Sequence, residues 1–314
     1  MTQPRNCIAV NARNFPWIGS ARMKIILIGA SGQLGTDLAK VFRSRGDMVL
    51  PLAHSEVDIR NSGRLTAVVT DEQPDIVIST AAFHKVEECE KQPQVAFDVN
   101  AVGAANLAQA CQSAGCALVF FSTDYVFGNA QRRPYSETDL PQPLNAYGVS
   151  KLAGEHLVAI GCKCHFIIRT CGLYGLAGSS GKGGNFVENM LKKAASEGQI
   201  KVVDDQVLTP SYTIDVAEAV ANLIPTERYG TYHISNEGEC SWYRFTEEIF
   251  RQEGQSADLG PVATCHFPSP AKRPSYSVLS KQKLRGVQIE IPHWQNALVR
   301  YLASRKEALQ TRRD

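Results

Sequence analysis

The stretch Met23-Lys-Ile-Ile-Leu-Ile-Gly-Ala-Ser-Gly-Gln-Leu-Gly-Thr-Asp-Leu-Ala39 decides the fold of this 314-residue chain. Its run of apolar residues predicts a buried strand of a parallel sheet, and the apolar spacing after the glycines predicts a helix. Gly29, Gly32 and Gly35 permit a tight turn and a close approach of strand and helix. Because the first N–H groups of a helix lack intrahelical acceptors, the turn predicts a pyrophosphate site and hence a dinucleotide cofactor.

Strands and helices continue to alternate after this first unit. At least five strand–helix units are predicted, without internal repeats, so the expected fold class is α/β with a doubly wound, Rossmann-like parallel sheet. We assign residues 23–170 to this dinucleotide-binding domain. The later strands are expected at 48–52, 75–79, 117–121 and 165–169, and the longer helices at 95–114 and 147–160.

The pattern changes after residue 170. Five glycines between 175 and 184 predict a flexible loop. We expect residues 171–314 to form a smaller C-terminal substrate-binding lobe that is interleaved with the first domain. Its predicted elements are a helix at 186–196, a strand at 200–203, a helix at 213–223 capped by Thr213, a strand at 231–234 and two amphipathic helices within 241–305.

The composition is that of an ordinary globular protein, with 44% hydrophobic and 20% charged residues. A net charge of +2, from 33 basic and 31 acidic residues, gives no reason to expect nucleic acid or a membrane surface as a partner. Nine scattered cysteines and the lack of a secretory signal predict a reduced, cytoplasmic protein. The one-residue gap in Cys162-Lys-Cys164 does not match zinc-binding spacing, so no metal site is predicted.

Residues 1–22 contain three arginines, no acidic residue and no apolar periodicity. They are expected to be a disordered N-terminal extension. Three origins stay open: a mis-assigned start with Met23 as the true initiator, a tail, or an organelle transit peptide.

Candidate catalytic residues follow the predicted strand at 117–121. Thr123 and Asp124 fall at its carboxyl end, where ligands of open parallel sheets bind. Tyr147 and Lys151 are four residues apart near the start of a helix, so both side chains leave the same face. An ammonium beside a phenol favours the phenolate, so this pair predicts a Tyr proton donor whose pKa is lowered by Lys151, with Thr123 bonding the same reacting oxygen.

Other polar residues lie where a cofactor is expected. Ala53 supplies no carboxylate at the end of the second strand, so NADPH as well as NADH is predicted, with His54 at the 2′-phosphate or simply exposed. Asp58 either contacts the adenine together with Ile59 or caps the next helix. Asn100 lies in a predicted helix, where its side chain either bonds a water or backbone carbonyl near Lys151 or is solvated.

Several motifs together resemble the extended short-chain dehydrogenase/reductase superfamily and, within it, the dTDP-4-dehydrorhamnose reductase family. The resemblance runs from Met23 to about Ala303. It rests on Gly-Ala-Ser-Gly-Gln-Leu-Gly at 29–35, Ser-Thr-Asp-Tyr-Val-Phe at 122–127, Ala-Tyr-Gly-Val-Ser-Lys at 146–151 and Arg-Pro-Ser-Tyr-Ser at 273–277.

The resemblance implies reduction of a nucleotide-linked 4-keto-6-deoxy sugar by NADPH or NADH, and it is compatible with a homodimer. Catalysis is assigned to Tyr147, Lys151 and Thr123. The predicted cofactor site also comprises Gly29, Gly32, Gln33, Leu34, Gly35, His54, Asp58, Ile59, Ala81, Ala82, Phe83 and Asn100, and the predicted substrate contacts are Thr123, Asp124, Gly172, Asn185 and Arg273.

One position departs from the family pattern. Gly172 stands where the family has a Trp that lines the sugar pocket, so a large apolar wall is expected to be missing. Two alternatives stay open: an epimerase that retains NAD, and a non-catalytic NADP-binding subunit resembling the regulatory subunit of methionine adenosyltransferase. Tyr125 follows Asp124 where related dehydratases have Glu, which argues against water elimination.

Overall fold

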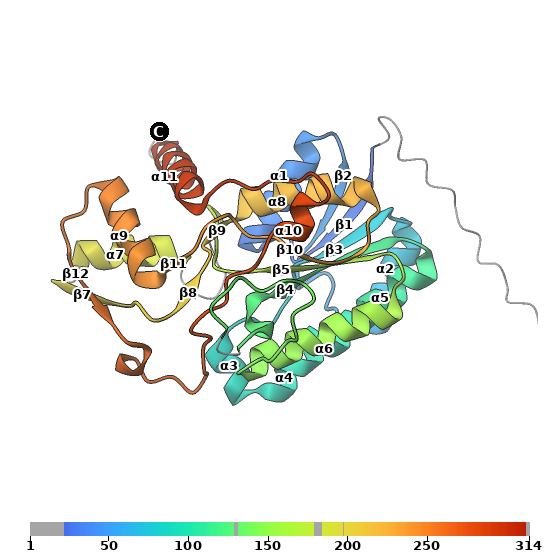
Figure 1. Cartoon of the computed structure of the whole chain (residues 1–314). Helices are drawn as coiled ribbons and strands as arrows, with labels where there is room; N and C mark the ends of the chain where they lie inside the picture. The colour runs from blue at the N-terminus through green and yellow to red at the C-terminus, as the bar shows by residue number, and fades with distance from the viewer. Residues whose placement is uncertain (1–21, 129–130, 179–183, 197, 312–314) are drawn as a thin grey trace, which may run out of the picture.

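A parallel sheet lies at the centre of the computed structural model, which describes residues 22–128, 131–178, 184–196 and 198–311. Within these residues six strands pair in the order β10-β5-β4-β3-β1-β2 (Figure 1). The predicted doubly wound sheet is confirmed. The strands are β1 (Lys24–Ile28), β2 (Met48–Leu52), β3 (Ile76–Ser79), β4 (Ala117–Thr123), β5 (His165–Thr170) and β10 (Gly230–His233).

Alternate side chains of each central strand enter different cores. Ile25 and Leu27 belong to the core on one face of the sheet, and Ile26 and Ile28 belong to the core on the other. Both faces are therefore covered, which explains why these strands are continuously apolar. The first core is closed by α1 (Gln33–Ser44) and α8 (Thr213–Leu223), and the second by α2 (Ser62–Glu72), α5 (Gly103–Ala114) and α6 (Ala146–Gly161).

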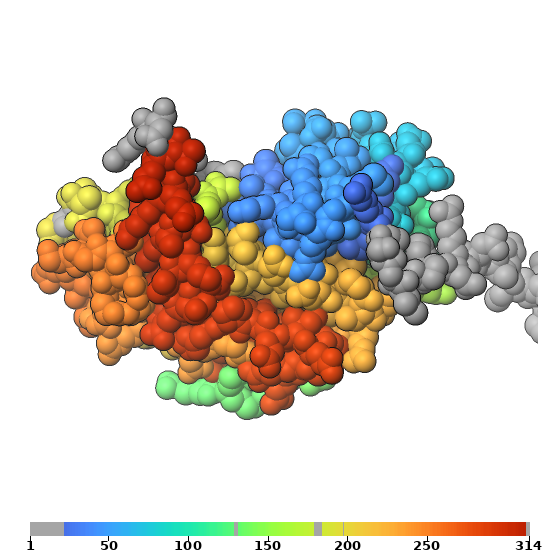
Figure 2. Space-filling view, turned by 90° about the horizontal axis from the view of Figure 1, so that it is seen from above, coloured from blue at the N-terminus to red at the C-terminus, as the bar shows by residue number. Residues whose placement is uncertain are grey.

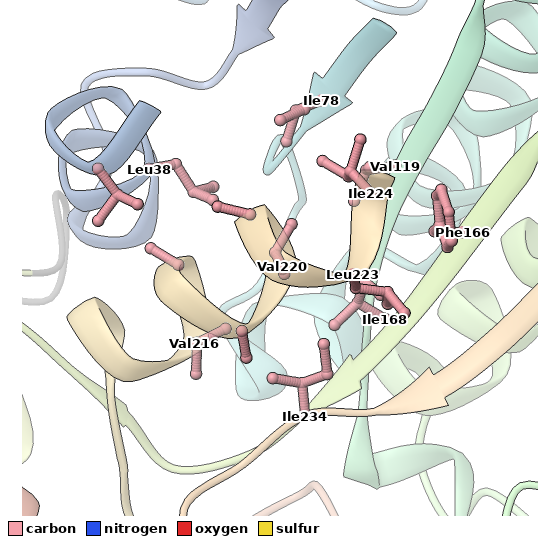
Figure 3. Packing of buried hydrophobic residues seen from close by; sticks show 14 of the residues in the cluster. Leu38, Ile78, Val119, Phe166, Ile168, Val216, Val220, Leu223, Ile224 and Ile234 are labelled. Atoms are coloured by element: carbon pink, nitrogen blue, oxygen red, sulfur yellow. The ribbon is translucent and has the colours of Figure 1, made fainter. Parts of the chain in front are cut away.

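Figure 3 shows the packing of α8 over the first core. Val216, Val220 and Leu223 follow one another at helical spacing and are fully buried, with Ile168 of β5 in the same cluster. Helix α8 therefore belongs to the sheet rather than to the lobe, although it comes late in the chain.

The last strand that the chain adds to the sheet is β10, which pairs with β5 in register from Gly230 opposite Phe166. Strand β10 lies at one edge of the sheet, and β2 lies at the other. Two segments that follow residue 170 in the sequence, α8 and β10, therefore belong to the sheet and not to the lobe.

The lobe has its own apolar core. It is built from α7 (Phe186–Ser196), α9 (Trp242–Glu253), α11 (Trp294–Gln310) and the parallel strands β7 (Gln199–Val203) and β12 (Asp258–Val262). Viewed from above, α11 in red runs between the orange and yellow lobe and the blue N-terminal part (Figure 2). Ion pairs tie α11 to both sides, because Arg300 binds Asp215 of α8 and Arg305 binds Glu188 of α7.

The segment predicted as one helix at 95–114 differs from expectation. It consists of α4 (Pro93–Phe97), a π-helical turn (Asp98–Val102) and α5. Asn100 lies in the π-helical turn and bonds the backbone of Phe83, which sequence periodicity could not reveal. Such π-turns are frequent beside functional sites.

The predicted cap of α8 is wrong. Tyr212 is the N-cap residue and makes no side-chain cap bond. The hydroxyl of Thr213 is instead buried and donates to Asp37 of α1 and to the carbonyl of Tyr174. Thr213 therefore joins two helices instead of capping one.

Most of the predicted N-terminal extension, residues 1–21, lies outside the described residues. None of the described helices is long and apolar enough to cross a membrane. The described residues also contain no group of three or more His, Cys, Asp or Glu side chains placed to hold a metal ion.

Candidate active site

The glycine turn between β1 and α1 is shaped for close backbone contacts. Gly29 has a φ of +80°, and a Cβ there would lie 2.5 Å from the Thr80 hydroxyl. A Cβ at Gly35 would lie 2.3 Å from the carbonyl oxygen of Gly29. Gly32 is the N-cap of α1 and offers no side chain, so the first N–H groups of the helix stay available to an anion.

Lys151 is held in an unusual environment for an ammonium group. It is 1% exposed, its Nζ lies 3.9 Å from the centroid of the Phe120 ring, and it has no hydrogen-bond partner within the described residues. Burial lowers the pKa of Lys151 to about 7, and the nearby Glu155 carboxylate opposes this shift. An unpaired buried ammonium costs free energy, so the site is complete only when a ligand supplies acceptors.

A buried ion pair anchors the helix that carries Lys151. Glu155, one turn further along α6, accepts hydrogen bonds from Arg169 of β5, with a shortest distance of 2.6 Å. Glu155 also accepts from the Ser122 hydroxyl of β4. These bonds fix α6 against the carboxyl ends of two strands, and so they fix the position of Lys151.

Tyr147 and Thr123 meet as predicted, but the pKa of Tyr147 moves in the opposite direction to that expected. Burial raises the pKa of the phenol, and its hydrogen bond with Thr123 opposes this only in part. Negative charge on the neighbouring groups Asp124, Cys89 and Tyr125 would raise this pKa further. In the protein alone, Tyr147 is therefore a protonated group, as a proton donor must be.

Asp124 is a buried carboxyl group beside this pair. It accepts hydrogen bonds from Thr123 at 3.1 Å and from Ser277 at 2.6 Å. Burial raises the pKa of Asp124 to about 7, although both hydrogen bonds lower it. Since Ser277 comes from the C-terminal part of the chain, Asp124 also joins the two halves of the site.

A cavity of about 700 Å³ joins these groups at the carboxyl ends of the strands. The residues around it fit a dinucleotide, because the open N-terminus of α1 and the unpaired Lys151 both face it. The predicted site residues that line it are Gly32, Gln33, Leu34, Ala82, Thr123, Asp124, Tyr147, Lys151, Gly172, Asn185 and Arg273.

Arg273 closes part of the cavity from the C-terminal side. It is ion-paired with Glu87 of α3 (Val86–Lys91), and its Nη1 lies 3.4 Å from the hydroxyl of Tyr125. Tyr125 in turn meets Tyr147 edge to face, with ring centroids 6.0 Å apart. The predicted substrate residue Arg273 is therefore linked through Tyr125 to the predicted proton donor.

The wall expected to be missing at Gly172 is supplied by other elements. Gly172 lines the cavity with a φ of +55°, and a Cβ there would lie 2.9 Å from Leu208, so a side chain would be strained. Trp242 and Phe186 line the same cavity with ring centroids 4.3 Å apart. The cavity is thus aromatic after all, on the lobe side.

A second cavity, also of about 700 Å³, adjoins the first. Five residues line both cavities: Glu87, Phe186, Gln206, Trp242 and Arg273. The second cavity is also lined by the ring of Phe267 and by three basic side chains, Lys193, Lys201 and Lys272. A long ligand with an anionic part and a flat ring could therefore extend from one cavity into the other.

Eight predicted cofactor residues lie outside the cavity lining: Gly29, Gly35, His54, Asp58, Ile59, Ala81, Phe83 and Asn100. His54 is exposed. Asp58 forms an ion pair with Arg60, and Asn61 rather than Asp58 caps α2. The side chain of Ile59 is 3% exposed and packs on Gly103, so only its backbone could reach a ligand.

Asn100 is another of these residues, and its hydrogen bonds are made to other parts of the protein. Its side chain exchanges two hydrogen bonds with the backbone of Phe83 and donates a third to Ser150. Asn100 therefore fixes the segment after β3 next to Lys151. The backbone of the glycine turn contains Gly29 and Gly35, and the segment after β3 contains Ala81 and Phe83. None of these four residues lines the cavity.

Asn185 lines the cavity, but its amide serves the lobe. It donates to the carbonyl of Gly175 and to the hydroxyl of Tyr301, and it accepts from the backbone of Glu188 at the start of α7. Sequence reasoning missed Trp242, Phe186, Tyr125, Gln206 and Asn189. Trp242 and Phe186 had no signal beyond their places in apolar patterns, since the lobe brings them to the site only after folding. Tyr125 follows Asp124 directly after β4, so the motif at 122–127 could have indicated it.

Comparison with known proteins agrees with this geometry. Residues 23–307 match the family model of the RmlD substrate binding domain. The spore coat polysaccharide biosynthesis protein SpsK of Bacillus subtilis (strain 168) is 39% identical over 91% of this chain and 99% of its own length. A dTDP-4-dehydrorhamnose reductase of Streptomyces griseus is 36% identical over 88% of this chain and 92% of that protein.

Solved structures give the same result. A dTDP-4-dehydrorhamnose reductase from Clostridium acetobutylicum ATCC 824 superimposes with a TM-score of 0.86 at 38% identity, covering 92% of this chain and all of the other. The enzyme of the same name from Bacillus anthracis, in complex with NADP, has a TM-score of 0.86 at 37% identity, covering 90% of this chain and 100% of that one. The chain therefore belongs to the dTDP-4-dehydrorhamnose reductase family, as its motifs predicted.

Proposed function

We propose that this protein reduces the keto group of a dTDP-linked 4-keto-6-deoxy sugar with NADPH, giving a product of the dTDP-rhamnose type. The observation that carries the proposal is the meeting of Thr123, Tyr147 and the unpaired Lys151 at one cavity beneath the glycine turn. Family membership and the NADP complex of the Bacillus anthracis relative support the same activity.

The residues of the glycine turn would hold the pyrophosphate of the cofactor. Gly32, Gln33 and Leu34 line the cavity at the start of α1, where N–H groups and the helix dipole favour a phosphate. When bound, the reduced nicotinamide supplies the hydride that reduction of a ketone requires. Lys151 would donate to the nicotinamide ribose, which provides the acceptors that its ammonium lacks in the protein alone.

Tyr147 would donate its proton to the oxygen of the sugar ketone as negative charge develops there. Its raised pKa keeps the phenol protonated before reaction. A charged Lys151 and the Thr123 hydroxyl would stabilise the phenolate that results. Because the group is enclosed, these contacts are stronger than they would be in water.

The two cavities would accommodate the two ends of the substrate. The sugar would lie beside Thr123 and Asp124 in the first cavity, and the nucleotide would extend past Trp242 and Arg273 into the second. Arg273 is a suitable partner for a diphosphate because a guanidinium binds anionic oxygens in pairs. A homodimer and a cytoplasmic location stay predictions from the sequence, as do the domain boundaries at residues 22 and 170.

The proposal is tested by mixing the purified protein with NADPH and a panel of nucleotide-linked 4-keto sugars. We expect NADPH absorbance to fall with dTDP-4-keto-6-deoxy sugars and the reduced sugar to appear in equal amount. An epimerase would interconvert sugars without net loss of NADPH. A binding subunit would retain NADPH affinity and convert none of the sugars.

A further inference from the structure

Thr170 ends β5 with a hydroxyl that the protein itself does not use. The residue is 6% exposed, and its Oγ1 has no hydrogen-bond partner in the described part of the chain. The residue lines the first cavity. Other buried threonines are bonded: Thr209 donates to the carbonyl of Gly238 at 2.7 Å, and Thr213 donates to Asp37.

Thr170 is close in space to Thr123 and close in sequence to a residue that contacts the glycine turn. It is the register partner of Thr123 on the neighbouring strand, so the two threonines lie side by side at the carboxyl ends of β4 and β5. Three residues later, the carbonyl of Leu173 accepts a hydrogen bond from Gln33 of α1 at 3.2 Å. Thr170 therefore lies beside Thr123 and three residues before a backbone group that contacts the glycine turn.

A buried hydroxyl without a partner destabilises the protein relative to an apolar side chain of the same shape. Retaining such a group makes physical sense where a ligand completes its hydrogen bonds. Two further unpaired polar atoms belong to residues that line the same cavity, Oε1 of Gln33 and Nζ of Lys151. Gln33 lies in the glycine turn, and Lys151 is already matched by the ribose in the proposed function. The remaining polar group at the nicotinamide end is the carboxamide, which has both a donor and an acceptor, as a hydroxyl does.

We propose that Thr170 hydrogen-bonds the carboxamide of the nicotinamide and so fixes the orientation of the ring at the cavity. The inference rests on the proposed function, because it requires that the cavity binds this cofactor. Thr170 would be a cofactor-binding residue in addition to those predicted from the sequence.

The first experiment compares Thr170→Val with Thr170→Ser and with Thr209→Val as the matched control. Binding of NADPH is measured by fluorescence titration, and thermal unfolding is measured on the protein without cofactor. We expect Thr170→Val to bind NADPH about tenfold more weakly, the equivalent of one hydrogen bond. Its melting temperature should be unchanged or higher, while Thr209→Val should melt lower without a matching loss of affinity. Thr170→Ser should bind like the wild type.

The second experiment uses NADP and its acetylpyridine analogue, in which a methyl group replaces the amide nitrogen. If Thr170 accepts from the amide N–H, the wild type should bind the analogue more weakly than NADP, and Thr170→Val should bind the two alike. If Thr170 donates to the carbonyl oxygen, which the analogue retains, Thr170→Val should lose about tenfold in affinity for both compounds. No loss of affinity for either compound in Thr170→Val would contradict the inference. Equal NADPH affinity of Thr170→Val and the wild type would overturn this inference alone. Failure of the wild type to bind NADPH would overturn the proposed function and this inference with it.

Discussion

Tyr147 and Lys151 are opposite cases of the same physical effect. Enclosure disfavours the charged form of each, so the pKa of the phenol rises and that of the ammonium falls to about 7. The free protein thus holds a neutral acid beside an amine that is close to its titration midpoint at neutral pH. Binding partners for Lys151 would restore its charge and favour release of the Tyr147 proton.

Removing only the Tyr147 hydroxyl separates chemistry from binding. We expect Tyr147→Phe to lower kcat by about 10² to 10⁴, because the general acid is lost while the ring remains. NADPH affinity should stay near that of the wild type, measured by the same fluorescence titration. Turnover close to the wild-type rate in Tyr147→Phe would show that another group donates the proton.

The pKa of Lys151 predicts a pH-dependent stability. The folded protein has a pKa of about 7 against an ordinary value of 10.5, so the folded state binds fewer protons between these values. Stability contributed by this residue is therefore lost as the pH falls from about 10.5 towards 7. Lys151→Met should raise the melting temperature of the cofactor-free protein more near about pH 6 than near about pH 10. An equal rise in melting temperature at both pH values would contradict this prediction, because the cost of burying a charged Lys151 must change with pH.

Among the individual site residues, the sequence predicted those that lie in local motifs and missed those that only folding brings together. Tyr147 and Lys151 share a helix, so their spacing alone placed them on one face. The aromatic wall was not predictable, because Trp242 comes from the lobe and stands almost a hundred residues from Tyr147. The direction of the Tyr147 pKa was also missed, since burial depends on the whole fold.

Helix α1 and its glycine turn depend on the absence of one methyl group. Gly35→Ala would place a Cβ 2.3 Å from the carbonyl oxygen of Gly29, which lies in backbone and cannot rotate away. We expect a loss of about 1 to 3 kcal/mol in the free energy of unfolding, measured in urea, together with weaker NADPH binding.

The matched control is Gly63→Ala in α2. Its Cβ would meet the side chain of Asn61 at an ordinary 3.7 Å, and alanine favours a helix over glycine. We expect a change in unfolding free energy from zero to a gain of about 1 kcal/mol. If Gly35→Ala and Gly63→Ala behaved alike, the close approach of turn and helix would not be a constraint.

Regular elements were predicted well, and the irregular ones were not. The predicted strand at 48–52 and the predicted helices at 186–196 and 213–223 have the observed bounds. The π-helical turn at 98–102 contains Asn100, which bonds the backbone of Phe83, and hydrophobic periodicity does not reveal such a tertiary contact. The wrong cap at Thr213 has the same origin, since Asp37 is far away in sequence.

The junction between sheet and lobe determines what the whole molecule can bind. Trp242 lines both cavities from the lobe side, where a flat base could stack on it. We expect Trp242→Ala to raise the KM for the dTDP-sugar roughly 5- to 150-fold, the equivalent of losing one base–aromatic stack. NADPH affinity should change little, because the glycine turn is untouched.

Tyr243→Ala is a suitable control for Trp242→Ala. Tyr243 is the next residue of α9, is also half-buried and lines neither cavity. Its substitution should leave the KM for the sugar near the wild-type value. A rise in KM of the same size in both variants would mean that the effect comes from a disturbed lobe and not from stacking.

The sheet can be completed only late in synthesis, because its edge strand β10 comes long after the strand with which it pairs. Strand β10 covers the edge of β5, but Gly230 follows Thr170 by some sixty residues. On the ribosome, a nascent chain long enough to hold the first five strands would still present β5 with unpaired backbone groups, a surface prone to pairing with other chains. The interval in which lobe segments leave the exit tunnel is therefore the period when this polypeptide most needs a chaperone.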